Sequence, residues 1–208
     1  MKRLFALLAR FQGEGVFNQY DNVCTAFDLP NGAAIRRANL QRYLELFSGA
    51  SYVLVGEAAG YAGCRFSGMP FTGEAQLVGA ERLPWARDAG FAQSSVGQPW
   101  RERSGTVVWE ALGQRRDCVL WNAFPWHPFD TKPLSNRRPL QAEMAQASEV
   151  LVHFLSLFPD AQVYAIGRMS QGALGEIGVA APYIRHPSHG GKAEFLKGIA
   201  CLPIVRAW

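Results

Sequence analysis

The chain has 208 residues, a formal net charge of +4 and a sequence pI near 9.0, with 49% hydrophobic and 18% charged residues. These values exclude a disordered chain and are typical of one compact domain, whose core is large enough to fold without disulfides or metal. The basic balance favours a polyanionic partner, because clustered Lys and Arg side chains release counterions from phosphate backbones. We expect a single domain over residues 1–208.

The first ten residues do not predict secretion. Their apolar run starts at Leu4 and is broken at Arg10, after six residues, whereas the hydrophobic core of a signal peptide has about 7 to 15. No stretch reaches the roughly 18 apolar residues of a membrane span. We therefore expect a cytoplasmic protein without a membrane partner.

The four cysteines are far apart and form no CxxC pair, and no histidine stands at zinc-finger spacing. They are Cys24, Cys64, Cys118 and Cys201. This pattern predicts free thiols in a reducing compartment and neither a metal site nor another cofactor.

The first half of the chain predicts two helices and two strands. Residues 33–47 have the apolar spacing of a surface helix, and residues 52–55 form a strand that runs into Gly56. Residues 60–73 are too rich in glycine for regular structure and predict a loop. Residues 84–103 predict irregular structure with at most a helical turn. Helical residues at 107–112 then lead into a second strand at 118–121.

The second half alternates in the same way. We expect the chain to leave the sheet at Asn122, because prolines and bulky aromatic residues fill 122–128. Pro139 at a first helical position predicts a long helix that extends to Phe158. The remaining elements are a strand at 161–166, a helix at 169–177, a strand at 182–184 and a helix at 193–199. This alternation predicts a three-layer α/β/α fold with a central, mostly parallel sheet.

Three predicted strands end in polar or glycine-rich residues. The first runs into Gly56-Glu57-Ala58-Ala59-Gly60, the second into Asn122, and the last stops just before His186-Pro187-Ser188. Ligands of open α/β sheets bind at the carboxyl ends of the strands, so these segments are expected to line one crevice.

The same segments, together with Gly68-Met69-Pro70-Phe71-Thr72-Gly73 and Asn136-Arg137, occur in the order of the motifs of a known family. The chain resembles the uracil-DNA glycosylase superfamily, most closely its family-four branch. It departs from that branch at Ala59, where the family has proline, and at His189-Gly190-Gly191 after the last motif. It also lacks the cysteine spacing of the iron–sulfur cluster, so we expect no cluster.

The resemblance implies roles for the residues around an extruded base. Gly56 and Ala58 would line the base pocket, and Phe71 would stack on the ring. Asn122 would read the polar edge of a pyrimidine, since its amide has both an acceptor and donors. His186 would donate a hydrogen bond to the developing oxyanion of the base.

The carboxylate of Glu57 would position or polarise the attacking water. The best-known branch places its catalytic aspartate one position later, where this chain has Ala58. Glu57 is therefore expected either to act on the water or to orient the loop.

The expected partner is DNA with a deaminated base, bound by a monomer. Ser188 and Lys192 would contact phosphates, His189 would enter the minor groove, and Arg137 would add positive charge. The implied activity is hydrolysis of the N-glycosidic bond of uracil in base excision repair. The alternatives are a glycosylase for hypoxanthine or xanthine, an inactive DNA-binding relative, and a nucleotide-binding protein whose glycine loop cradles phosphate, although GxGxxG and GxxxxGK are both absent.

Overall fold

The computed structural model describes residues 1–205 and is built around a parallel sheet of four strands. The strand order is β3-β2-β5-β6. The strands are β2 (Tyr52–Ala58), β3 (Cys118–Phe124), β5 (Gln162–Ile166) and β6 (Tyr183–Ile184). Parallel strands need crossover connections, and here helices supply them, as the alternating sequence predicts.

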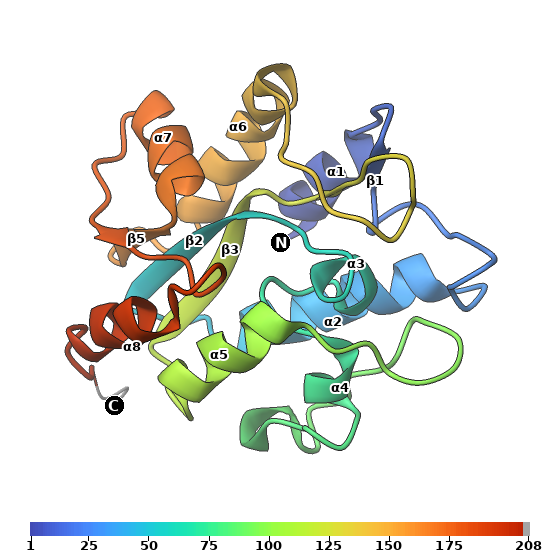
Figure 1. Ribbon diagram of the computed structural model, residues 1–208, viewed down its shortest axis with the longest axis horizontal. Helices are drawn as coiled ribbons and strands as arrows, with labels where there is room; N and C mark the ends of the chain where they lie inside the picture. The colour runs from blue at the N-terminus through green and yellow to red at the C-terminus, as the bar shows by residue number, and fades with distance from the viewer. Residues whose placement is uncertain (206–208) are drawn as a thin grey trace.

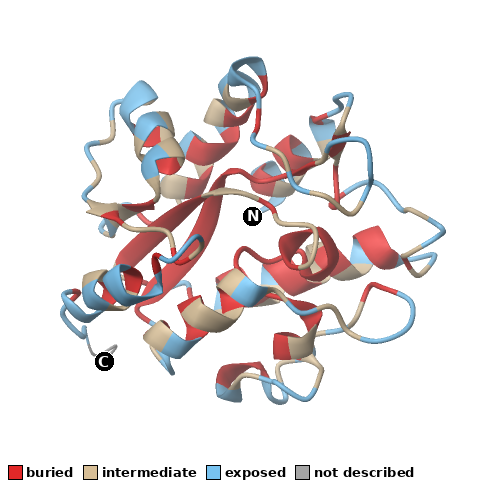
Figure 2. Ribbon diagram, viewed as in Figure 1, coloured by how far each residue is buried: buried red, intermediate tan, exposed pale blue. Residues whose placement is uncertain are grey.

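Helices cover both faces of this sheet (Figure 1). One layer holds α1 (Lys2–Arg10), α6 (Gln141–Leu155) and α7 (Arg168–Glu176), and the other holds α2 (Gly32–Leu46), α5 (Arg103–Leu112) and α8 (Lys192–Ala200). The predicted three-layer α/β/α class is therefore confirmed. Figure 2 shows that β2 and β3 are buried along most of their length, with exposed residues on the outer faces of the helices.

Shorter elements fill the connections. They are β1 (Val16–Phe17), which pairs antiparallel with β4 (His127–Pro128), the one-turn helices α3 (Cys64–Ser67) and α4 (Glu74–Leu77), and the 3-10 turn η1 (Pro84–Ala86). The segment 60–73, predicted as a loop, thus contains one helical turn. The N-terminal helix α1 was not predicted at all.

Strand β3 extends three residues beyond its predicted end. Asn122 pairs with Gly56 and Phe124 with Ala58, so the chain leaves the sheet only after Phe124. The prediction was wrong because the prolines start at Pro125, and the aromatic residues before it suit a strand buried on both faces. Pro139 was predicted at the first position of a helix, but it precedes α6, which begins at Gln141.

A buried network of charges fixes the segment that follows β2. Asp28 forms ion pairs with Arg36, at 3.3 Å, and with Arg65, and all three side chains are almost fully buried. Close by, Glu74 accepts hydrogen bonds from the backbone N–H groups of Ser94 and Ser95, at 2.6 and 3.0 Å. Residues 64–74 are thereby tied to α2 and to the irregular segment before α5.

Replacing Asp28 with alanine is expected to lower the free energy of unfolding by about 3–5 kcal/mol, because two buried guanidinium groups then lose their counter-ion. Urea unfolding measures this change. The control is Glu149→Ala, whose partner Arg3 is 3.6 Å away in an exposed pair, and the expected loss there is below about 1 kcal/mol. Equal effects of the two substitutions would contradict the structural role given to the buried network.

Candidate active site

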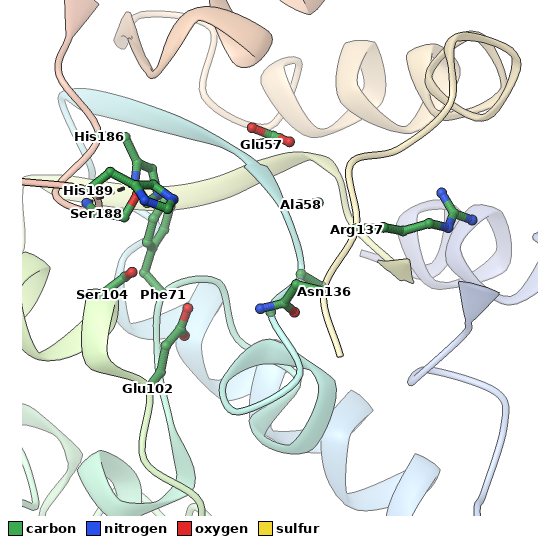
Figure 3. Close-up of a pocket in the computed structure, with 12 residues that line it drawn as sticks. Glu57, Ala58, Phe71, Glu102, Ser104, Asn136, Arg137, His186, Ser188 and His189 are labelled. Carbon is green, nitrogen blue, oxygen red and sulfur yellow. Dashed lines mark hydrogen bonds between the residues drawn. The ribbon is translucent and has the colours of Figure 1, made fainter. Parts of the chain in front are cut away.

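The predicted crevice exists as a cavity of about 270 Å³ at the carboxyl ends of the strands. Figure 3 shows that its walls come from segments far apart in the sequence. They are the end of β2, the glycine-rich segment with Phe71, the start of α5 with the residue before it, the loop before α6 and the loop between β6 and α8. The lining residues are Glu57, Ala58, Ala59, Gly60, Phe71, Glu102, Ser104, Asn136, Arg137, His186, Ser188 and His189.

Phe71 forms part of the cavity wall and packs on the backbone of Gly56. A Cβ atom at Gly56 would overlap the phenyl ring, so only glycine permits this contact. Phe71 has a φ of 52°, in the left-handed region that bulky residues seldom adopt, at a cost of about 1–3 kcal/mol. The ring centroid is 5.9 Å from that of His186. The structure thus brings Gly56, Phe71 and His186 together as predicted.

Asn122 lies behind this wall. Its Oδ1 would be 3.0 Å from a Cβ at Gly56, next to the Phe71 ring, but the residue is only 2% exposed and does not line the cavity. Asn122 is therefore adjacent to the predicted base site rather than open to it.

His186 is held as a neutral imidazole. Its Nδ1 accepts a hydrogen bond from the backbone N–H of Ser188, at 3.1 Å, and lies 2.7 Å from the Ser188 hydroxyl. Because a backbone N–H can only donate, Nδ1 has no proton and Nε2 has one. Burial, helped by Arg185 and His189, lowers the pKa of His186 to about 4. The Nε2–H group has no partner among the described residues and can donate to a ligand.

The ring protons of His186 should therefore titrate with a midpoint near pH 4 rather than at the ordinary 6.5. NMR of the folded protein measures this midpoint. Because the unfolded chain binds the proton more readily, His186 lowers the free energy of unfolding as the pH falls from 6.5 towards 4. A midpoint at 6.5 or above would show that the imidazole is charged in the site at mildly acidic pH.

Glu57 projects from the end of β2 and lines both this cavity and a larger neighbouring one. Burial raises the pKa of its half-buried carboxyl, and the charge of Arg138 opposes that shift. A carboxylate that is partly desolvated accepts a proton more readily, which suits a group that polarises water. Ala58 and the backbone of Gly60 complete this side of the wall.

The neighbouring cavity, of about 430 Å³, is a basic groove. It shares Glu57, His186 and His189 with the first cavity, and Arg138, Arg168 and Arg185 also line it. Such a groove suits a phosphate backbone. Arg168 and Arg185 were not singled out from the sequence, because no local charge cluster marks them.

The residues predicted to contact DNA differ in how far their polar groups are already used within the protein. Arg137 uses all its guanidinium N–H groups on Glu143, Gly15, Phe129 and Arg138, which leaves none for a phosphate, so its role is to fix the loop before α6. The backbone N–H of Ser188 donates a hydrogen bond to Nδ1 of His186, so this N–H is not available to a phosphate.

Two predicted DNA contacts remain on the surface. Lys192 is exposed and forms an ion pair with Glu110, at 2.8 Å. His189 is exposed at the tip of its loop with a φ of 50°, beside both cavities. Their contacts with DNA stay predictions.

Asn136 belongs to the Asn136-Arg137 motif, but no role was predicted for it. It accepts a hydrogen bond from the backbone N–H of Tyr61, at 2.9 Å, and so joins two walls. Glu102 and Ser104 also line the cavity and were not singled out from the sequence. Glu102 brings a buried carboxyl group into the cavity. It lies in the segment 84–103, whose composition predicts only irregular structure.

No group of three or more His, Cys, Asp or Glu side chains within residues 1–205 is arranged to hold a metal ion. The four cysteines are free thiols, of which Cys64 and Cys118 are buried. In the same part of the chain, no helix has both the length and the apolar character to cross a membrane.

Together, the fold and the site define an α/β protein with a small cavity beside a basic groove at the carboxyl ends of the strands. A family model described as the uracil DNA glycosylase superfamily matches residues 45–204. The chain therefore belongs to the uracil-DNA glycosylase superfamily, as the resemblance predicts; its place in one branch stays a prediction.

The fold is similar to that in the crystal structure of wild-type Pedobacter heparinus SMUG2. The TM-score is 0.62 at 12% sequence identity, over 96% of this chain and 94% of the other. No curated protein matches the chain.

Proposed function

We propose that this protein is a monofunctional DNA glycosylase that hydrolyses the N-glycosidic bond of uracil, or of another deaminated base, flipped out of DNA. The observation that carries the proposal is the neutral His186, whose Nε2–H is free at a cavity walled by the Phe71 ring and next to a basic groove. Membership of the superfamily supports a hydrolytic glycosylase in general.

The chemistry requires stabilisation of a departing anion. The base takes the electron pair of the glycosidic bond while positive charge builds on the sugar, so a donor aimed at a base oxygen stabilises the transition state more than the ground state. A neutral imidazole N–H provides such a donor and keeps the proton on the enzyme. The low pKa of His186 keeps this form dominant across the neutral range.

The remaining groups position the reactants. Phe71 offers its ring for stacking, worth about 1–3 kcal/mol per base. Asn122, which lies beside the Phe71 ring, would pair with the polar edge of a pyrimidine that enters as far as that ring. Glu57 would hold the water that attacks the sugar. Extrusion of the base from the stack costs a few kcal/mol, which these contacts offset.

These features alone do not determine which damaged base is excised. Uracil, hypoxanthine and xanthine all present an oxygen to an N–H donor, and the cavity volume of about 270 Å³ leaves room for more than one kind of ring. We propose uracil as the main substrate because the Asn122 amide complements its N3–H and O4 edge. Cytosine reverses that edge and would leave buried groups unpaired.

An excision panel tests the proposal. Single- and double-stranded oligonucleotides with one uracil, hypoxanthine or xanthine are incubated with the protein, and abasic sites are revealed by strand cleavage in alkali. Excision of at least one deaminated base, with no action on undamaged DNA, is the expected result. Binding without excision of any lesion would favour a DNA-binding relative that has lost catalysis, a reading consistent with Ala58 in place of the aspartate of the best-known branch.

A further inference from the structure

Glu102 is the most unusual polar group of the cavity. It is the N-cap residue of α5, where a carboxylate normally accepts hydrogen bonds from the first backbone N–H groups, yet its side chain caps nothing. Its Oε2 is fully buried and has no hydrogen-bond partner within residues 1–205. This oxygen lies against Gly63 and is costly to ionise there, whereas the other oxygen, Oε1, lies beside Gly60, which also lines the cavity.

Glycine residues make room for this carboxyl group. A Cβ atom at Gly63 would overlap Oε2, and one at Gly60 would lie 3.3 Å from Oε1. The backbone of Gly73 also passes close to the backbone of Glu102 and would clash if it had a side chain. The glycine-rich segment 60–73, which the sequence marks as special, therefore holds Glu102 in place as well as Phe71.

The carboxyl group lies on the wall of the same cavity as His186 and Phe71. In the view of Figure 3 it lies on the other side of Phe71 from His186, next to Ser104. A ligand stacked in this cavity therefore meets one polar group from each side.

We propose that Glu102 contacts the extruded base as an uncharged carboxylic acid and donates a hydrogen bond to it from the side of the cavity away from His186. This inference rests on the proposed glycosylase function and deepens it by adding a further donor to the base. An ionised carboxylate would repel both the departing anion and the DNA backbone, whereas the neutral acid stabilises the anion.

The charge state agrees with this role. Burial raises the pKa of Glu102 to about 8, so the acid form dominates at neutral pH. The neighbouring segments carry Tyr61, Cys64, Arg101 and Arg103. The other walls of the cavity carry Glu57, Arg137, His186 and His189. None of these groups contributes to the shift of the Glu102 pKa, which is due to burial alone.

The test is the pH dependence of single-turnover uracil excision from pH about 6 to about 10. Wild-type activity should fall about tenfold per pH unit above the Glu102 pKa of about 8. Glu102→Gln keeps an N–H donor that does not titrate in this range, so its rate should stay within about tenfold of wild type at neutral pH and lose that fall. Glu102→Ala should lose about 10²-fold at neutral pH. The control, Glu149→Gln on an exposed face of α6, should keep the wild-type profile.

Identical pH profiles of the wild type and Glu102→Gln would overturn the inference, as would a wild-type rate for Glu102→Ala. If the alanine variant does not fold, the glutamine variant decides the matter. If the wild type excises no base, the proposed function fails and the inference is tested by binding instead. The probe is then an oligonucleotide with 2′-fluoro-deoxyuridine, whose glycosidic bond resists cleavage. Affinity should fall above pH about 8 for the wild type and stay level for Glu102→Gln; equal pH dependence would reject a contact with the base.

Discussion

Replacing His186 with alanine is expected to lower the single-turnover rate of uracil excision by about 10²- to 10³-fold, the usual cost of removing one donor from an oxyanion site. The reason is the fixed tautomer: the Ser188 N–H occupies Nδ1, so the Nε2 proton is directed to a ligand. DNA binding should change little, because the basic groove keeps Arg138, Arg168 and Arg185.

The measurement is a rapid-quench assay with enzyme in excess over a uracil-containing oligonucleotide. The matched control is His153→Ala, which removes an imidazole from α6 that lines neither of the two cavities. That variant should excise uracil at the wild-type rate. A His186→Ala rate within about twofold of wild type would show that His186 does not act on the base.

Replacing Gly56 with alanine is the second large expected effect. The new Cβ atom would overlap the Phe71 ring and lie 3.0 Å from Oδ1 of Asn122, so one methyl group displaces both neighbours of the base site. We expect a loss of at least about 10²-fold in excision rate, because small displacements of positioning groups are that costly. Overpacking should also lower the free energy of unfolding by about 1–3 kcal/mol.

Excision kinetics and urea unfolding measure the two effects of Gly56→Ala. Gly172→Ala is the control, since a Cβ atom there meets nothing within 4 Å. Gly172 lies within α7, so this substitution should keep activity and raise stability by up to about 1 kcal/mol. Full activity of Gly56→Ala would mean that the Phe71 ring can move away without consequence for the reaction.

The layered fold could be predicted because its elements have strong local patterns. The apolar runs of β2 and β3 and the helical spacing of α6 determine structure nearly by themselves. Boundaries and short elements could not be predicted, because they depend on tertiary pairing. Strand β3 continues to Phe124 only because Ala58 pairs with it, and α1 is an amphipathic helix whose buried face needs α6 as a neighbour.

The candidate site was predictable where a residue stands at the carboxyl end of a strand or just after it. Glu57 and Ala58 end β2, His186 follows β6, and Phe71 joins them through the glycine-rich segment. The role of Arg137 could not be predicted, because its charge suggests DNA whereas its guanidinium group pairs with the nearby Glu143. Glu102 could not be predicted, because only its burial distinguishes it from an ordinary surface carboxylate. An irregular segment shows no periodic sequence pattern from which burial could be inferred.

The proposed reaction requires the cavity to receive a nucleobase between Phe71 and His186. A crystal structure of the protein with an oligonucleotide containing 2′-fluoro-deoxyuridine tests it most directly. We expect the uracil ring to be stacked on Phe71, with a base oxygen within hydrogen-bond distance of His186 Nε2 and the DNA backbone along the groove of Arg138, Arg168 and Arg185. An ordered DNA strand whose uracil stays stacked in the strand or lies elsewhere on the protein, with the cavity closed to it, would contradict the claim.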